Sequence, residues 1–398
     1  MSANLYTPGV RIDGTDVGPL ILEGGTIEYG RQSVFDQPGA SICELTLFTY
    51  DGYPQAPKAW FEFGVGEYGG VSGFVDAYED TYAGPVARLN LNAPVWVSAT
   101  TPPGFVEEYD DTYTGAEFRR FTGRIQAIQY DVDRIHITAT DDLERWARVG
   151  ILAEPDPAPD TSDQTDVDRV EWLADQTPAP TTLHVRGTGY AVLTEIAAED
   201  YPICLLDALQ AIAADCDAVV YCDREGRVTY RTYGDREHLD PGPTIPPEIV
   251  EWDSVSMELN LGMVENVVRV EYGAADARDA VTRTDSDSVD LYGPRVGYYE
   301  TQLLNYGDAD IHARKIAASL SAAWDMPDAT LLMNLATNAQ VEDLMALDIG
   351  DVVTFDTLPS GAPVTSICTE ILGYTEYLSA DEWAIDLHLA HYTDTGGS

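Results

Sequence analysis

Residues 118–140, FRRFTGRIQAIQYDVDRIHITAT, carry the clearest structural signal in this chain. Phe121, Gly123 and Ile125 share one parity, and after a turn at residues 131–133 apolar and polar residues alternate again. Successive side chains of a strand point to opposite faces of a sheet. The stretch therefore predicts a β-hairpin with one buried face and one face in water.

The remainder of residues 1–150 also has the pattern of β structure. Short apolar or alternating runs recur between turn signals such as Gly24-Gly25 and Pro38-Gly39. Strand runs at this spacing favour a barrel or a sandwich over a layered α/β fold. We predict an N-terminal β-barrel domain over residues 1–150, with loop insertions at residues 65–82 and 100–113.

The centre of the chain predicts two different segments. Residues 151–180 are rich in Pro and Asp, and we predict a linker there because so little apolar surface cannot offset the entropy of ordering. Leu205, Leu209 and Ile212 recur at helical spacing ahead of two strand-like runs. This order predicts a small α/β domain over residues 181–248.

Residues 249–398 return to a β pattern and predict a second β-barrel domain with one long helix at residues 308–324. Asp308 is the expected N-cap of that helix, and Ile311, Ile316 and Leu320 belong to its expected apolar face. The predicted fold class is therefore mainly β with an α/β insertion, comprising two β-barrel-like domains and a small α/β domain.

The two β regions are similar to each other at one place. Residues 121–140 and 368–389 both predict long hairpins, and each ends in an alternating strand with a histidine on the wet parity, His136 and His388. Two copies of one barrel on either side of an α/β insertion would leave such a similarity. Internal duplication is the hypothesis that follows.

The charge balance excludes several classes of partner. The 398 residues contain 22 Lys and Arg against 68 Asp and Glu, a formal net charge of −46. Such a surface repels nucleic acid and anionic membranes, so we expect no sequence-specific nucleic-acid binding. The sequence has no run of roughly 18 to 20 apolar residues and no N-terminal secretory signal, and we expect no membrane insertion.

The five cysteines predict reduced thiols. They are an odd number, are widely spread and form no C-x-x-C pair, which is typical of buried thiols in a protein made in the cytoplasm. A disulfide between Cys216 and Cys222 is the alternative.

Motifs that carry known chemistry are missing from the sequence. It contains no G-x-x-x-x-G-K-[ST], G-x-G-x-x-G, H-E-x-x-H or G-x-S-x-G motif. His388 and His391 are three apart, which places them on opposite faces of a strand. The acidic runs at residues 107–111 and 285–290 lack the turn and distal Glu of a calcium loop and predict solvated loops, with an adventitious divalent site as the alternative. We therefore name no catalytic, cofactor-binding or metal-binding residue and expect no enzyme.

The 23 tyrosines indicate extensive contacts. A tyrosine ring contributes contact area at low entropic cost while its hydroxyl stays in water, which suits protein interfaces. Glycan stacking is the other use of such rings, and both uses stay open.

Four segments, in this order, resemble the tail-tip or baseplate hub proteins of long-tailed phages and of related prophage and archaeal-virus tails. The segments are FTGRIQAI (121–128) with IHITATDDLERW (135–146), LLDALQAIA (205–213) with the turn DREG (223–226), ENVVRV (265–270) with DSVDLYGPR (287–295), and LDIGDVVT (347–354) with ILGY (371–374) and WAIDLHL (383–389). Their order and spacing carry the resemblance, which covers most of the chain from residue 118 onward.

The resemblance implies two similar β-barrels per chain and assembly as a homotrimer around the tail axis. It implies a structural virion protein, a hub or minor tail protein at the distal tail tip, that adapts the six-fold tail tube or distal-tail ring to a three-fold tip and lines the DNA ejection channel. The implied partners are the distal tail protein ring, the tail tube, the tape measure protein, and tail fibre or receptor-binding proteins. Assembly would take place in the host cytoplasm.

The sequence departs from this family at both ends. Many hubs continue into a peptidase, lysozyme-like or receptor-binding region, whereas the last predicted strand lies directly before Ser398, so we expect partners to supply any such activity. Residues 1–117 match the family only in being rich in β structure.

Alternatives remain for both the function and the acidity. A tail protein that binds host glycan or receptor is the alternative function, and a secreted glycoside hydrolase is a third. A negatively charged channel that lets DNA slide is one explanation of the acidity; a halophilic host, with carboxylates spread over the outer surface, is the other.

Overall fold

The computed structural model describes residues 7–12, 15–16, 22–31, 37–48, 60–62, 86–88, 94–100, 117–130, 134–153, 161, 164–177, 181–196, 201–237, 243–322, 324–362, 364–379 and 383–392. The predicted insertion at residues 65–82 and the acidic run at residues 107–111 lie outside these ranges. So does the insertion at residues 100–113, apart from Thr100.

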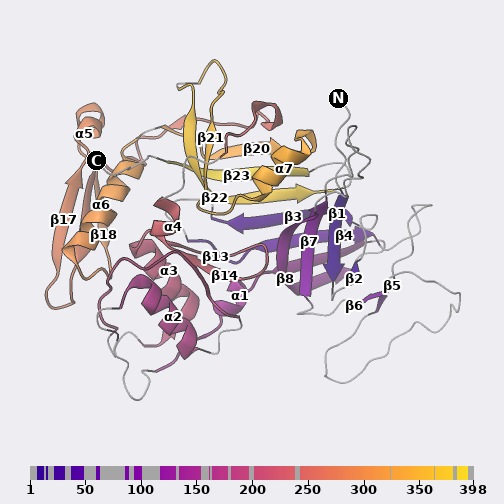
Figure 1. Cartoon of the computed structure of the whole chain (residues 1–398), viewed down its shortest axis with the longest axis horizontal. Coiled ribbons are helices and arrows are strands. Elements are labelled where there is room, and N and C mark those ends of the chain that lie inside the picture. The colour runs from indigo at the N-terminus through magenta and orange to yellow at the C-terminus, as the bar shows by residue number, and fades with distance from the viewer. Residues whose placement is uncertain are drawn as a thin grey trace, which may run out of the picture.

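An 11-stranded sheet, here called the shared sheet, is the largest element of the fold (Figure 1). Its strands follow the order β2-β1-β7-β8-β9-β4-β3-β22-β23-β20, and β21 pairs with β22 outside this path. The strands are β1 (Thr7–Ile12), β2 (Thr15–Asp16), β3 (Leu22–Gly30), β4 (Ile42–Phe48), β7 (Pro94–Thr100), β8 (Glu117–Tyr130), β9 (Arg134–Thr140), β20 (Asp328–Leu332), β21 (Val352–Phe355), β22 (Ile367–Leu378) and β23 (Trp383–His391).

Both predicted hairpins are present. The stretch at residues 118–140 forms β8 and β9, which pair antiparallel, and Ile135, Ile137 and Ala139 of β9 point into the core. The C-terminal hairpin is β22 and β23. Alternation of apolar and polar side chains thus located the strands correctly.

The strands do not form two separate barrels. Strand β3 pairs antiparallel with β22, from Gly25 opposite Leu378 to Gly30 opposite Gly373. The described strands therefore form one open path rather than closed rings, and the N- and C-terminal β regions share a sheet and a hydrophobic core. The mainly β class with an α/β insertion is confirmed, but the picture of independent barrels is corrected, because pairing between distant strands cannot be seen in local alternation.

The α/β insertion is larger than the sequence predicted. It contains the small sheet β11-β14-β13 and two helices that pack on each other. Its elements are α1 (Leu143–Trp146), β10 (Gly150–Ile151), α2 (Asp166–Gln176), β11 (His184–Arg186), β12 (Ile203–Cys204), α3 (Leu205–Asp215), β13 (Val219–Cys222), β14 (Val228–Arg231) and α4 (Tyr233–Glu237).

The linker predicted over residues 151–180 is wrong where α2 forms. Thr165 caps this helix in a reciprocal capping box with Asp168, and Val170 and Leu173 are buried in the core. A capping box satisfies two backbone donors at the start of a helix. The acidic, Pro-rich composition hid this short local signal.

Residues within the predicted second barrel form a separate unit at one end of the molecule (Figure 1). A three-stranded sheet of order β17-β16-β18 is covered on one face by α6. Its elements are β16 (Val267–Tyr272), β17 (Asp279–Thr284), α5 (Ser286–Tyr292), β18 (Val296–Glu300) and α6 (Tyr306–Leu320). The acidic run at residues 285–290 is therefore the start of a helix capped by Asp285, not a loop.

Helix α6 differs from the predicted helix at residues 308–324. Asn305 is its N-cap, and the carboxylate of Asp308 accepts a hydrogen bond from the backbone N–H of Val192 at 3.0 Å. The buried face consists of small and polar residues, including Ala313 and His312, whereas Ile311 is 42% exposed. Close approach of the helix to its sheet selects small residues for the buried face.

The described chain contains several further short elements. They are β5 (Trp60–Glu62), β6 (Val86–Arg88), η2 (Pro247–Ile249), β15 (Glu258–Leu259), β19 (Trp324–Asp325), η3 (Met333–Leu335) and α7 (Asn338–Met345). In the part of the chain that the structure describes, no helix combines the length and apolar character needed to cross a membrane.

Two hydrophobic cores organise the chain. One belongs to the shared sheet and includes Leu45 and Phe355. The other runs through the α/β insertion and into the unit of α6, with Leu209 and Val270 among its members. The insertion and the α6 unit are therefore packed together as one body beside the shared sheet.

A buried ion pair crosses the core of the shared sheet. The Nε of Arg120 on β8 lies 2.9 and 2.8 Å from the two carboxylate oxygens of Glu376 on β22, and the side chains are 1% and 0% exposed. The indole N–H of Trp383 donates to the same carboxylate at 2.7 Å. The guanidinium groups of Arg120 and Arg224 both lie over the Tyr374 ring, 5.4 and 5.5 Å from its centroid.

Replacement of Glu376 by Gln should therefore destabilise the fold strongly. The variant leaves the buried Arg120 charge without its counter-ion, and breaking a buried pair in this way costs about 3–5 kcal/mol. Urea unfolding followed by tryptophan fluorescence measures the change. Glu144→Gln is the control. Glu144 pairs with Arg148, whose side chain is 71% exposed, and such surface pairs contribute about 0.5 kcal/mol to stability. Equal effects of the two substitutions would contradict the argument.

Candidate functional site at the junction of three units

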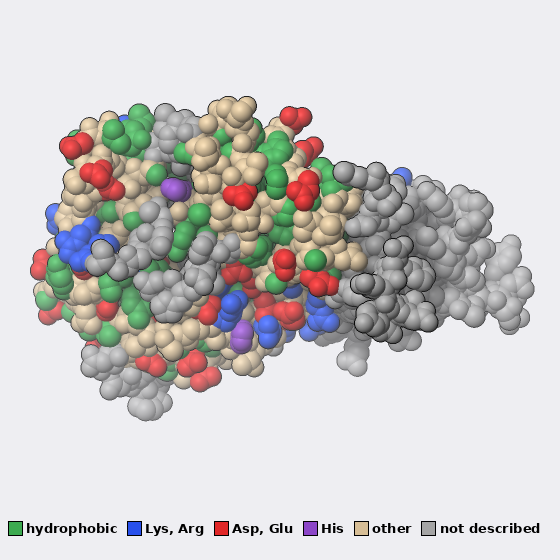
Figure 2. All heavy atoms as spheres, turned by 45° about the horizontal axis from the view of Figure 1, so that its top comes forward, with side chains coloured by type: hydrophobic (Ala, Val, Ile, Leu, Met, Phe, Trp, Pro, Cys, Tyr) green, Lys and Arg blue, Asp and Glu red, His purple; other side chains and the backbone are tan. Residues whose placement is uncertain are grey.

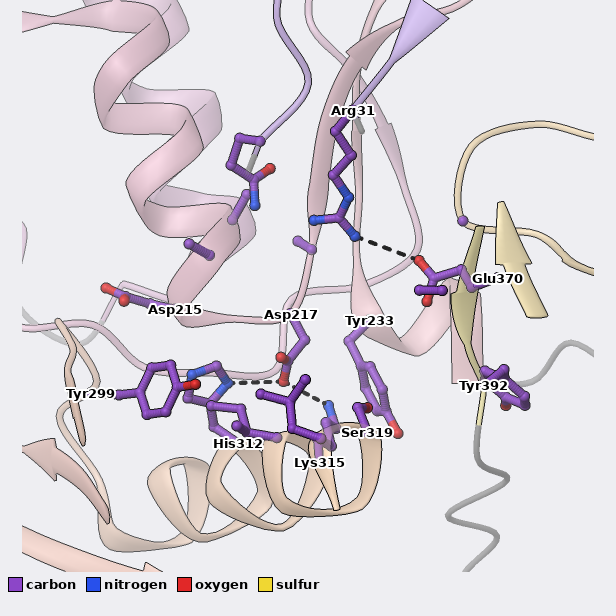
Figure 3. Close-up of a pocket in the computed structure, with 18 of the residues that line it drawn as sticks. Arg31, Asp215, Asp217, Tyr233, Tyr299, His312, Lys315, Ser319, Glu370 and Tyr392 are labelled. Carbon is purple, nitrogen blue, oxygen red and sulfur yellow. Dashed lines mark hydrogen bonds and ion pairs between the residues drawn. The ribbon is translucent and has the colours of Figure 1, made fainter. Parts of the chain in front are cut away.

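A cavity of about 430 Å³ lies where the shared sheet, the α/β insertion and α6 meet (Figure 3). Its charged and aromatic lining comes from all three units and includes Arg31, Asp215, Asp217, Tyr233, Tyr299, His312, Lys315 and Glu370. A sizeable cavity with converging polar groups is the natural candidate for a functional site.

Asp217 occupies the centre of this arrangement. Helix α3 ends at Asp215, and Asp217 takes a left-handed backbone conformation, with φ of 50°, before the chain enters β13. Asp and Asn tolerate this conformation better than most residues with a side chain. The turn directs the Asp217 carboxylate toward α6, where its Oδ2 lies 3.0 Å from Nδ1 of His312 and 3.3 Å from Nζ of Lys315 (Figure 3).

His312 and Lys315 lie on one face of α6 because they are three residues apart. Burial lowers the pKa of His312, but the Asp217 carboxylate, aided by Asp215, outweighs burial and raises this pKa above its ordinary value. The imidazolium form is therefore favoured beside Asp217. The ring of Tyr299 meets the imidazole edge-on, with centroids 6.5 Å apart.

Lys315 is enclosed by tyrosine rings. Its ammonium lies over the ring of Tyr233 and 5.1 Å from the ring centroid of Tyr190. A cation over an aromatic face is attracted by the ring quadrupole. Lys315 is one of only two lysines in the chain, and it joins α6 to α4 as well as to Asp217.

Asp215 forms a second carboxylate of the same wall. Burial raises its pKa to about 6, although its Oδ2 accepts the backbone N–H of Gln302 at 2.9 Å. Its protonated form is therefore favoured in the folded protein compared with an Asp in water.

The opposite wall belongs to the shared sheet. Arg31, which follows β3, faces Glu370 of β22 at 3.7 Å, and both side chains are mostly buried. The charges named on both walls thus have partners of opposite sign close by. This geometry serves to hold three units in register, and the proton-binding groups make the junction sensitive to pH.

A second junction involves the LDIGDVVT segment. The hydroxyl of Tyr221 on β13 donates to the Asp348 carboxylate at 2.7 Å, and Nη2 of Arg231 on β14 lies 2.8 Å from the Asp351 carboxylate. Nη1 of Arg231 donates to the carbonyl of Ile349 at 2.7 Å. This segment therefore fastens the insertion to the shared sheet, which gives a degenerate sequence motif a physical role.

The structure places the candidate residues from the sequence analysis at separate positions. His388 lies 3.1 Å from Asp328 on one side of β23, whereas His391 lines the cavity, as their offset predicted. The five cysteines are free thiols. Among the described residues, no group of three or more His, Cys, Asp or Glu side chains is arranged to hold a metal ion.

Sequence reasoning missed the junction at Asp217. The available signal was His312 and Lys315 at helical spacing in a chain almost without lysine. Their partner lies 95 residues away from His312 in sequence, and only the fold brings it close.

Solved structures of tail proteins match almost the whole chain. A tail protein from Neisseria meningitidis has a TM-score of 0.59 at 11% identity, with 97% of this chain and 96% of that chain covered. The prophage MuSo2 43 kDa tail protein from Shewanella oneidensis has a TM-score of 0.54 at 11% identity, with coverage of 98% and 97%. An Escherichia coli component of the type VI secretion system, described as similar in structure to T4 bacteriophage tail proteins gp27 and gp5, has a TM-score of 0.50 at 10% identity and covers 98% of this chain and 78% of that chain.

Sequence comparison gives no comparable match. No family model matches the chain, and no curated protein matches it. The likeness is therefore one of structure: this chain has the fold of phage and prophage tail proteins over nearly its full length.

Replacement of Asp217 by Asn should lower the pKa of His312. Asn tolerates the left-handed backbone, so the substitution removes the negative charge with little strain, and burial then dominates the histidine. NMR titration of the histidine ring protons measures the shift among only six histidines. Asp328→Asn, beside the partly exposed His388, is the matched control for His312. An unchanged His312 titration would show that Asp217 does not set its protonation.

Replacement of Asp215 by Asn should flatten the dependence of stability on pH. The pKa of Asp215 is raised on folding from 3.8 to about 6, so its contribution to stability is full below pH 4 and is lost as the pH rises through 6. Asn keeps the acceptor for Gln302 without a charge. Urea unfolding should find Asp215→Asn more stable than the parent at pH 8 by about 1–3 kcal/mol, and similar to it near pH 4. A variant less stable at pH 8 would contradict this.

Proposed function

We propose that this chain is a structural virion component, the hub or minor tail protein at the distal tip of a long-tailed virus, without catalysis. The observation that carries the proposal is the likeness to tail proteins over 97% of the chain, together with four ordered segments that resemble hubs. The likeness to a protein described as similar to gp27 and gp5 favours the hub position among tail proteins.

Two similar hairpins support an internally duplicated hub. Both β8–β9 and β22–β23 contain a bulge, one at Ile125 and the other at Ile371. Each second strand carries a histidine that lies beside a threonine of a neighbouring strand. His136 lies 3.0 Å from Thr46 of β4, outside its hairpin, whereas His388 lies 3.3 Å from Thr375 of β22, inside its hairpin, so the hairpins share the histidine but not its contact. Three copies of a chain with two such elements would present six equivalent positions, which suits an adaptor between a six-fold tail ring and a three-fold tip.

The acidity suits a protein that DNA passes without binding. A net charge of −46 gives a polyanion no favourable surface, so a channel lined by this protein would let DNA slide during ejection. The proposed neighbours are the distal tail ring or tail tube, the tape measure protein, and tail fibre or receptor-binding proteins. The glycan-binding alternative stays a prediction, because its Tyr-rich loop at residues 65–82 lies outside the described residues.

The purified chain should form a homotrimer. Light scattering coupled to size exclusion should give three times the chain mass of 43.5 kDa at high protein concentration, and electron micrographs should show rings with six lobes. The charge repulsion between copies weakens with added salt, so the measurement is made over a salt series. A monomer at every salt and protein concentration, or glycan binding by the isolated chain on an array, would contradict the hub assignment.

A further inference from the structure

The outer side of α6 presents cations and apolar groups in an otherwise acidic chain. Tyr306, Asp310 and Arg314 are spaced by four and lie on one stripe of the helix. Asp310 is held by Arg283 of β17 and by Arg314 at 2.7 Å, so two guanidinium groups share one carboxylate. Figure 2 shows Lys and Arg side chains gathered at the end of the molecule that carries this unit.

This surface, here called the cationic patch, consists of Arg283, Tyr306, Ile311 and Arg314. Nη2 of Arg283 donates to the Tyr306 hydroxyl at 3.2 Å, which fixes the two side chains together. Tyr306 and Ile311 are 53% and 42% exposed, and the side chain of Arg314 is 66% exposed. Exposed tyrosine and arginine beside an aliphatic residue are the composition of an interface centre.

A surface of opposite character lies on the outer face of the shared sheet. Thr26 of β3 stands opposite Glu44 of β4 and opposite Tyr377 of β22. These residues border a groove of about 330 Å³, and Gly24 and Gly25, which have no side chain, also line it. We call this surface the acidic groove.

Carboxylates and exposed apolar groups surround the acidic groove. Glu28 of β3 and Asp386 of β23 stand on either side of Thr375, which is two residues from Tyr377 on the same face of β22. Tyr377 is 39% exposed and Ile42, opposite Glu28, is 38% exposed. The groove therefore combines negative charge with apolar contact area, as the cationic patch combines positive charge with apolar contact area.

We propose that the cationic patch of one copy docks on the acidic groove of a second copy. The inference rests on the proposed hub function and names the surfaces that join its subunits. Two chains of net charge −46 repel each other, so a local cationic surface that faces carboxylates favours association at that place. The two surfaces belong to different units of the fold (Figure 1), which makes the contact head-to-tail, and such a contact closes into a ring when the rotation between successive copies closes.

The test uses charge reversal on each side. Arg314→Glu and Glu44→Arg should each weaken self-association by about tenfold or more, measured by light scattering and native mass spectrometry over the same salt series as the parent chain. In an equimolar mixture of the two single variants, each contact between unlike chains pairs surfaces of opposite charge, and the double variant Arg314→Glu with Glu44→Arg restores the match on every chain. Both should associate more tightly than either variant alone.

Arg148→Glu is the matched control. Arg148, like Arg314, is an exposed arginine that pairs with an acidic residue four positions earlier, but it lies on the segment after α1 and outside the cationic patch. Its reversal should leave association unchanged. Ile311→Asp tests the patch without touching the Asp310 pairing, and it should weaken association as Arg314→Glu does.

The outcomes separate the two proposals. A trimer that tolerates Arg314→Glu, Glu44→Arg and Ile311→Asp would overturn the docking inference and leave the hub assignment intact. Loss of association in the single variants without recovery in the double variant would also overturn the direct pairing of these surfaces. A parent chain that stays monomeric throughout would overturn the hub assignment and the docking inference together.

Discussion

The pairing of Arg120 with Glu376 is the constraint on which the rest of the structure depends. The two residues are 256 positions apart, and both are removed from water inside the core of the shared sheet. Neither charge is tolerable there alone, so the N-terminal β8 and the C-terminal β22 must enter the same core. The stack of Tyr29 on Tyr374, with centroids 5.1 Å apart, extends the same seam between β3 and β22. The shared sheet is therefore a consequence of long-range polar matching as well as of apolar burial.

The same device recurs inside the insertion and where the insertion meets another part of the chain. Arg231 is fully buried and joins β14 to the segment before β21, and Arg169 is fully buried and donates to the carbonyls of Thr161 and Thr194 at 3.1 and 2.8 Å. At Asp217 the charges are the other way round, since one carboxylate contacts two cations. Since a buried hydrogen-bonded charge accepts few alternative partners, these contacts specify how the units sit, whereas the apolar cores supply most of the burial energy.

The local structure could be predicted from the sequence. The way in which the units pack together could be predicted only in part. Alternation at residues 118–140 located β8 and β9, and the helical spacing of Leu205, Leu209 and Ile212 located α3. The sequence predicted a start of helix α6 two residues later than the observed start, and it predicted that Ile311 is buried. Apolar periodicity does not detect a buried face that consists of small and polar residues such as Ala313. The candidate site lay beyond reach, since Asp217, His312 and Arg31 come from segments with no local signal that they meet.

The distribution of positive charge bears on how so acidic a chain folds and on the contact proposed between its copies. With 22 cations for 68 carboxylates, every guanidinium placed inside the protein removes one from the surface. Arg120, Arg169 and Arg231 are buried in this way, and carboxylates such as Glu376 and Asp166 are buried with them. Exposed cations are then scarce, and a place where Arg283 and Arg314 share a single carboxylate stands out against that background. An acidic surface of an identical chain can supply the cationic patch with the contacts that solvent supplies. High salt weakens the general repulsion between copies. It weakens this attraction less when the apolar neighbours of the arginines are buried together with them.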